Sequence, residues 1–116
     1  METILYSDVQ NEAMDQAEQM IQNQLPDIKT NSIVAFQHLF KKLCRPLNNV
    51  SVIVSWIASQ RELNYLATMA PLFADNRLIL ILPDKSPLIV ESGLRLSPSF
   101  IGYSDGNFMD VIAVLE

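Results

Sequence analysis

Residues 52–56 read Val52-Ile53-Val54-Ser55-Trp56, and they indicate how the whole chain folds. Three consecutive β-branched residues without an alternating polar position predict a strand covered on both faces, as in the middle of a parallel sheet. A doubly wound α/β domain places its functional groups just beyond the carboxyl ends of such strands. Ser55 and Trp56 are therefore the first residues to consider as part of a functional site.

Strand and helix patterns alternate through the rest of the chain. Each predicted strand is short and rich in aliphatic, β-branched or aromatic residues. Most of the segments that follow space their apolar residues three or four apart, which predicts amphipathic helices. The predicted strands are Thr3–Tyr6, an edge strand Asp27–Thr30, Val50–Val54, Leu78–Leu82 and Phe100–Tyr103, and the predicted helices are Glu12–Gln24, Val34–Cys44, one beginning at Ser59, one between Ser86 and Gly93, and one from Phe108 onward.

Capping residues, prolines and glycines set the expected boundaries of the helices. Asn31 and Ser32 offer capping oxygens to the second helix, and Ser59-Gln60-Arg61-Glu62 matches a capping box at the start of the third. Pro71 predicts a kink or an early end of that third helix. Gly93 suits a left-handed exit from a short fourth helix.

This order predicts a flavodoxin-like doubly wound α/β fold, a three-layer sandwich around a five-stranded parallel sheet with strand order 2-1-3-4-5. A chain of 116 residues fits one domain, residues 1–116, with a sizeable core. The last helical pattern still runs at Glu116. We therefore expect the domain to be a fragment of a longer chain.

Composition excludes several classes of partner. The formal net charge is -5 and the eight basic residues are scattered, so we expect no nucleic-acid binding by this domain. The longest aliphatic run, Leu78–Leu82, is far shorter than a membrane span. The single cysteine, Cys44, cannot form an internal disulfide. We therefore expect a cytoplasmic protein without membrane contacts.

Four stretches in this order carry a resemblance to a known family. They are Ile4-Leu5-Tyr6-Ser7-Asp8, Val34-Ala35-Phe36-Gln37-His38-Leu39, Val52-Ile53-Val54-Ser55-Trp56 and Glu91-Ser92-Gly93. With this order and spacing, the chain resembles a response-regulator receiver domain of two-component signalling over essentially its whole length. The resemblance implies a signalling domain whose switch site lies at the carboxyl ends of the strands.

The resemblance also implies that the phosphorylation site is degenerate. Receivers hold Mg²⁺ with an acid pair after the first strand, and Ser7 and Asp8 stand there in this sequence. Ser55 replaces the phosphoacceptor aspartate, Pro83 falls near the conserved hydroxyl, and Tyr103 falls near the conserved lysine. Only Asp8 keeps the chemistry of the family.

These replacements remove the groups that bind Mg²⁺ and form an acyl phosphate. Mg²⁺ favours several oxygen ligands including carboxylates, so Asp8 alone should hold it poorly. Ser55 cannot form an acyl phosphate, and a serine nucleophile needs an adjacent base, which His38 on the second helix does not supply. Asp8 is more readily explained as a helix cap and Ser55 as a structural residue. We expect no catalytic residues, no metal and no cofactor.

Apolar residues gather toward the end of the chain, in elements that can each bury only one face. Some of these side chains should stay on the surface and form a partner site, either for another protein or for a second copy. The alternative is that Leu94 and Leu96 fold back over the core. The candidate interface residues are Leu88, Ile89, Val90, Leu94, Leu96, Phe100, Met109 and Val114.

Two functional hypotheses follow. The first is a regulatory domain that is not an enzyme, that is not competent for aspartyl phosphorylation, and that acts through contacts of its fourth-helix and fifth-helix face. The second is a small-molecule-binding or enzymatic domain that uses the crevice at the strand ends. In the second case the expected lining is Asp8, Ser55, Trp56, Asp84 and Asp105.

Overall fold

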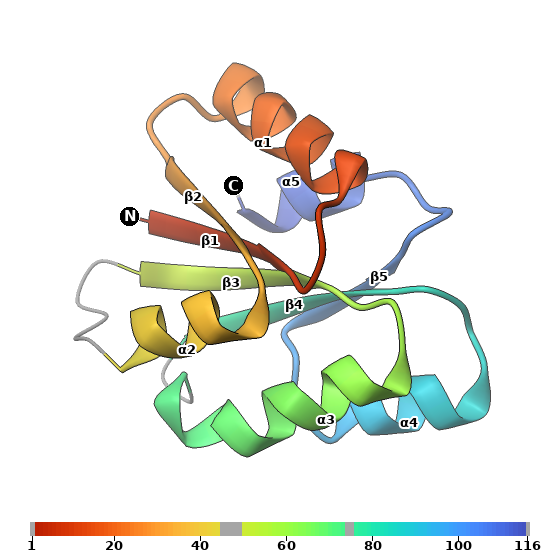
Figure 1. Ribbon diagram of the computed structural model, residues 1–116. Coiled ribbons are helices and arrows are strands. Elements are labelled where there is room, and N and C mark those ends of the chain that lie inside the picture. Colours follow the sequence, from red (N-terminus) through yellow and green to blue (C-terminus); the bar gives the residue numbers. More distant parts are fainter. Residues whose placement is uncertain (1, 45–49, 74–75, 116) are drawn as a thin grey trace.

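A computed structural model of the chain describes residues 2–44, 50–73 and 76–115. Within these residues five parallel strands form one sheet in the order β2-β1-β3-β4-β5, which confirms the predicted fold class and strand order (Figure 1). The short loops and helical crossovers keep all five carboxyl ends at one edge of the sheet. The strands are β1 (Glu2–Ser7), β2 (Lys29–Val34), β3 (Val50–Trp56), β4 (Arg77–Leu82) and β5 (Phe100–Tyr103).

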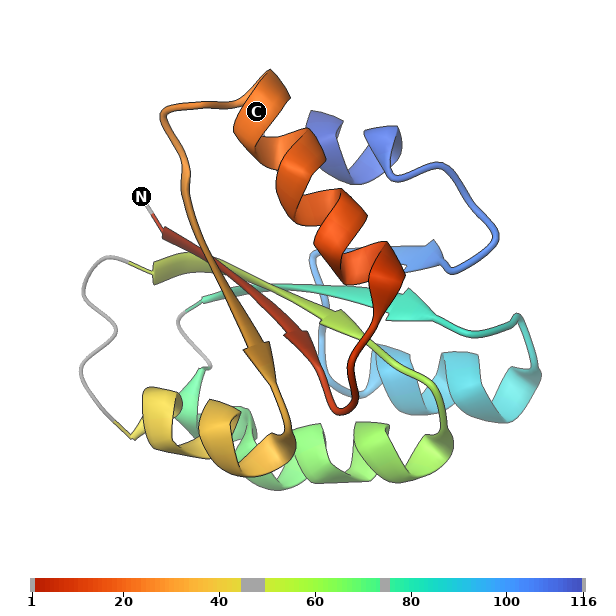
Figure 2. The same ribbon diagram turned by 45° about the horizontal axis from the view of Figure 1, so that its top comes forward.

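Helices cover both faces of the sheet and complete the three layers. One face carries α1 (Glu12–Gln24) and α5 (Met109–Leu115), and the other carries α2 (Phe36–Leu43), α3 (Gln60–Met69) and α4 (Pro87–Leu94), as Figures 1 and 2 show. The 3₁₀ turn η1 (Ala70–Leu72) follows α3 directly. Pro71 lies inside η1, so the expected early end of α3 is confirmed.

Two apolar clusters fill the space between the layers, one on each face of the sheet. Successive side chains of a strand point to opposite faces. Ile53 and Ile57 therefore pack under α2, α3 and α4, whereas Val52, Val54 and Trp56 pack under α1 and α5. Burial on both faces explains why β3 and β4 read as unbroken apolar runs in the sequence.

The edge strand was predicted in the wrong place. β2 covers Lys29–Val34, where its register with β1 runs from Glu2↔Lys29 to Ser7↔Val34. Asn31 and Ser32 lie inside this strand and do not cap a helix. An edge strand tolerates polar side chains because one side of it meets solvent, so two residues that also favour a helix cap lie within a strand here.

Gly93 does not end a helix in the left-handed conformation. It is the buried seventh residue of α4, which continues to Leu94, and the positive φ of this region belongs to Ser97 at 53°. A Cβ atom on Gly93 would lie 3.3 Å from Leu80 Cδ1. The missing side chain therefore serves close packing of α4 on β4 and not a change of backbone direction.

Candidate functional site

A crevice of about 380 Å³ opens at the carboxyl ends of the strands. Its apolar wall comes from Trp56 at the end of β3, from Ile57 just after it and from Ile81 on β4. Glu12, in the first turn of α1, is the one charged residue among those that line it. The full lining is Ser7, Val9, Gln10, Asn11, Glu12, Trp56, Ile57, Ala58, Ile81, Pro83 and Ser104.

The structure brings only part of the predicted site to this crevice. Of the five positions that replace the receiver phosphorylation residues, Ser7 and Pro83 line it. Asp8, Ser55 and Tyr103 do not. Of the lining expected for a ligand site, Trp56 is present, and the carboxylates Asp8, Asp84 and Asp105 lie outside it.

Ser55 lies in the interior of the molecule. β3 continues past it to Trp56, so Ser55 sits one residue inside the strand, between Tyr6 on β1 and Leu80 on β4. It shares the sheet face of Ile53, is fully buried, and its Oγ atom has no hydrogen-bond partner among the described residues. Trp56, and not Ser55, is the strand-end residue that reaches the crevice.

Asp8 holds the start of a helix. Its Oδ1 atom accepts a hydrogen bond from the backbone N–H of Phe36 at 3.2 Å, which satisfies one of the free amides in the first turn of α2. The Tyr6 hydroxyl donates to the same oxygen at 3.5 Å. The first loop is closed separately, because Asn11 Oδ1 accepts from the Ala13 amide at 2.8 Å and caps α1.

Tyr6 stays protonated beside this carboxylate. Burial raises the pKa of its hydroxyl, and the negative charges of Asp8 and Glu62 raise it further. The neutral hydroxyl can therefore donate to Asp8 at any ordinary pH. The two residues work as a structural pair that joins β1 to α2.

Glu62 is a buried carboxylate that belongs to the start of α3. Its Oε2 atom accepts from the Ala58 amide at 2.9 Å and from Ser59 Oγ at 3.3 Å. The capping box marked the correct start of the helix, since Ser59 is the N-cap and α3 begins at Gln60. Its hydrogen bonds differ from the expected pattern, because Ser59 donates to the glutamate instead of accepting from the backbone.

Tyr103 faces a cation that sequence reasoning missed. The Nζ atom of Lys85 lies 5.1 Å from the centre of the Tyr103 ring, within the range of a cation–π contact. Asp84 precedes this lysine and is used locally, because its Oδ1 atom accepts from the Ser86 amide at 2.9 Å. No periodicity or spacing signal in the sequence links Lys85 to Tyr103.

A second cavity, of about 390 Å³, lies between α1, α5 and β5. Trp56 lines it as well and stacks on Phe108 with ring centres 5.8 Å apart and planes inclined by 13°. Gly102 contributes to the hollow, since a Cβ atom there would come within 3.1 Å of Ile81 Cδ1. Trp56 thus has apolar surface in both cavities.

The predicted interface residues separate into surface and core. Leu88, Leu94 and Met109 are exposed, at 64%, 58% and 41%. Ile89 is buried because it faces the sheet from α4, one turn before Gly93, so it does not belong to the surface. The others are half-buried: Val90 and Leu96 pack on the α2–α4 side, and Phe100 and Val114 pack on the α1–α5 side.

Neither a metal-binding cluster nor a membrane-spanning helix is present among the described residues. Residues 2–44, 50–73 and 76–115 contain no group of three or more histidine, cysteine, aspartate or glutamate side chains placed to hold a metal ion. Within the same ranges, none of the helices is both long enough and apolar enough to cross a bilayer.

Comparison with known proteins assigns the fold. No family model and no curated protein matches this sequence. Solved structures do match: a response regulator receiver protein from Pseudomonas putida has a TM-score of 0.78 at 10% identity, over 98% of this chain and 93% of that chain. The chemotaxis response regulator CheY4 of Vibrio cholerae has a TM-score of 0.76 at 12% identity, over 99% and 96%.

A third match comes from a longer protein. RcsB from Salmonella enterica serovar Typhimurium, solved bound to promoter rprA in the presence of the phosphomimetic BeF₃⁻, has a TM-score of 0.77 at 14% identity. The match covers 99% of this chain but 66% of the RcsB chain. This chain therefore has the fold of response-regulator receiver domains, and at these identities the likeness concerns the fold alone.

Proposed function

We propose that the chain is a receiver-like regulatory domain in signal transduction that acts through protein contacts and does not undergo aspartyl phosphorylation. The observation that carries this proposal is how the residues at the receiver switch positions are used. Asp8 caps α2, Ser55 is fully buried, and Glu12 is the one charged residue that lines the crevice.

Electrostatics support this function. An acyl phosphate adds about two negative charges, which receivers balance with Mg²⁺ and a lysine. The lining of this crevice contains no cation, and Lys85 is held over the Tyr103 ring outside it. The proposal includes a cytoplasmic location and no catalytic role, and it places the partner contact on the exposed apolar residues Leu88, Leu94 and Met109.

Trp56 provides a direct test of the crevice, because it is the single tryptophan of the chain and lines the site. We expect its fluorescence to stay unchanged when millimolar Mg²⁺ and then beryllofluoride are added, since Glu12 is the one carboxylate among the described residues that line the crevice. A receiver domain that retains its acid pair serves as the positive control. A saturable change that needs both Mg²⁺ and beryllofluoride would show that the switch site still works.

Small-molecule binding is a second candidate function, favoured by the two cavities that meet at Trp56. Their volumes of about 380 and 390 Å³ fall in the range of ligand sites. A ligand that binds only the folded state raises the melting temperature. A thermal-shift panel of nucleotides, flavins and divalent metals tests this candidate, and a concentration-dependent rise that Trp56→Phe reduces would favour it over the regulatory function.

A further inference from the structure

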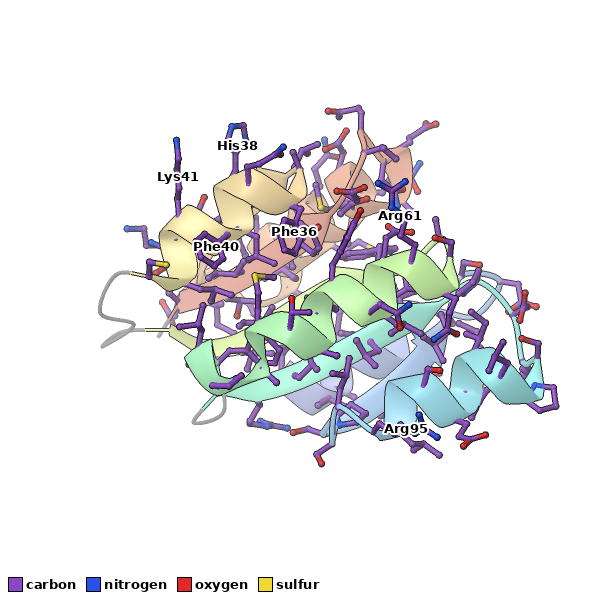
Figure 3. The ribbon with its side chains drawn as sticks, turned by 60° about the horizontal axis from the view of Figure 1, so that its bottom comes forward. Phe36, His38, Phe40, Lys41, Arg61 and Arg95 are labelled. Atoms are coloured by element: carbon purple, nitrogen blue, oxygen red, sulfur yellow. The ribbon has the colours of Figure 1, made fainter. Side chains whose placement is uncertain are left out.

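An aromatic strip crosses from α2 to α3, on the face opposite α1 and α5. We define it as Phe40, Phe36 and Tyr65. Figure 3 shows Phe36 and Phe40 on the side of α2 that is turned toward α3. The two phenylalanines lie one helical turn apart, so their rings occupy the same flank of α2.

A ring contact joins the two helices within the strip. The rings of Phe36 and Tyr65 have centres 4.7 Å apart and planes inclined by 49°, a tilted contact typical of aromatic pairs. Arg61 lies with its guanidinium carbon 5.2 Å from the Tyr65 ring centre and donates a hydrogen bond to the Tyr65 hydroxyl. At the other end Phe40 is 45% exposed, so a large part of its apolar side chain is open among the described residues.

The exposed charges carried by α2 and α3 have one sign, whereas the half-buried Asp8 is bound to the Phe36 amide. Lys41 projects from the outer flank of α2, and Arg61 stands at the start of α3 (Figure 3). The one carboxylate on these two helices, Glu62, is buried and engaged with the Ala58 amide. The strip therefore lies between cations, with no exposed carboxylate on either helix.

The opposite layer has the reverse character. Helices α1 and α5 carry four carboxylates and no lysine or arginine. The whole chain is also acidic, with a net charge of -5. The cationic face is thus a local feature against an acidic background. Such a separation of charge steers and selects partners of the complementary sign. The carboxylates are Glu12, Asp15, Glu18 and Asp110.

We propose that the α2–α3 face binds an acidic amphipathic helix of a partner protein. The apolar side of that helix covers Phe40, and its carboxylates pair with Lys41 and Arg61. A helix laid along an apolar surface is a common mode of peptide recognition, and exposed aromatic residues are frequent anchors. This site lies on α2 and α3 and does not depend on the α4 surface of the proposed function.

Two other occupants fit less well. A single-stranded nucleic acid needs several open ring faces for stacking, but Phe36 and Tyr65 contact each other and Arg61 already covers Tyr65. A second copy could offer its acidic α1, but Met14, Ala17 and Ile21 of that helix are buried in its own core. A second copy would therefore bring the charge of α1 without an apolar anchor for Phe40.

Selection from a displayed library tests the proposal. The probe is a library of helical peptides of about 16 residues, or roughly four turns. The positions on one face of each helix, and the positions that flank this face, are randomised. We expect enriched peptides to combine aliphatic or aromatic residues one turn apart with flanking carboxylates. Synthesised winners should bind Phe40→Ala at least about tenfold more weakly and Lys41→Glu about fivefold more weakly, with the wild-type affinity falling as salt is raised.

Matched variants and competing ligands decide the outcome. Val9→Ala and Lys85→Glu change an exposed apolar residue and an exposed cation outside this face, and the peptides should bind both as they bind the wild type. Circular dichroism verifies that every variant is folded. The proposal is overturned by a selection that enriches no peptide or enriches basic ones, by equal binding to Phe40→Ala, or by Phe40-dependent binding of oligothymidine or self-association in place of peptide binding.

Discussion

At the residue scale, Asp8 and Ser55 are two polar side chains near the carboxyl ends of neighbouring strands, and their surroundings differ. Asp8 is half-buried and satisfied by the Phe36 amide and the Tyr6 hydroxyl. Ser55 is fully buried and its hydroxyl has no partner among the described residues. A hydroxyl in an apolar layer is tolerated, whereas a carboxylate in the same place would need a cation or several donors.

Substitutions at Ser55 test whether this side chain is buried in an apolar layer. We expect Ser55→Asp to lower the free energy of unfolding by about 3 kcal/mol or more at neutral pH, because it buries an unpaired charge. Ser55→Ala should change it by less than about 1 kcal/mol, since no hydrogen bond is lost. Urea denaturation measures both, with the exposed Ser99→Asp as the matched control. A Ser55→Asp protein as stable as the wild type would show that this position opens to solvent.

At the element scale, the start of α2 combines a good cap with an unfavourable backbone. Ala35 is the N-cap residue and has φ 81° and ψ 137°, a conformation that a side chain disfavours. Its amide donates to the Ser7 carbonyl at 3.1 Å, so the end of β1 fixes the turn. The Asp8 bond to the Phe36 amide then begins the helix.

Replacing the residue at this turn should increase stability. We expect Ala35→Gly to raise the free energy of unfolding by about 1 kcal/mol, because glycine adopts positive φ without a steric cost. The same change at Ala13, an exposed position in α1, should lower it by about 1 kcal/mol. Thermal and urea unfolding report both values. A loss of stability in Ala35→Gly equal to that in Ala13→Gly would mean that the turn at Ala35 is not strained.

Helices and strands with a clear apolar pattern could be predicted from the sequence. Segments whose residues suit two different local structures could not. α1 matches its predicted bounds because the spacing of its apolar residues marks an amphipathic helix, and the bounds of β5 match as well. β2 was misplaced because its polar residues also suit a cap. Gly93 was misassigned because the sequence does not reveal that α4 approaches Leu80 closely.

The site was predictable in position but not in the orientation of its side chains. The strand order correctly places a crevice at the ends of β1, β3 and β4, and Ser7, Trp56 and Pro83 line it. β3 runs two residues past its predicted end at Val54, to Trp56, so Ser55 lies inside the strand and its side chain is buried on the face of Ile53. Glu12 and Lys85 were missed, since their placement depends on how two loops fold.

At the scale of the whole molecule, two exposed surfaces lie away from the strand-end crevice. One consists of the exposed apolar residues Leu88 and Leu94 on α4 and Met109 on α5, which lie on opposite sides of the sheet, and the other is the cationic α2–α3 face. Apolar side chains that are this exposed favour association when they gather in one area. Regulation through surfaces does not require chemistry at the strand ends.

Self-association tests the α4 surface. We expect sedimentation velocity to show a concentration-dependent dimer, and Leu88→Lys to return the chain to a monomer. Val9→Lys, which changes another highly exposed apolar residue, should leave the dimer unchanged. A chain that stays monomeric at the highest concentration would leave a different protein as the partner of this surface.

A phosphoryl-transfer assay tests most directly whether this chain lacks aspartyl phosphorylation. The chain is incubated with acetyl phosphate and Mg²⁺ and its intact mass is recorded over time, beside a receiver domain that retains its acid pair and phosphoacceptor. We predict that the receiver gains one phosphoryl group while this chain keeps its mass unchanged, because Ser55 is buried and Asp8 is committed to the start of α2. A phosphoryl adduct on Asp8 or Ser55, identified by peptide mapping, would contradict the account.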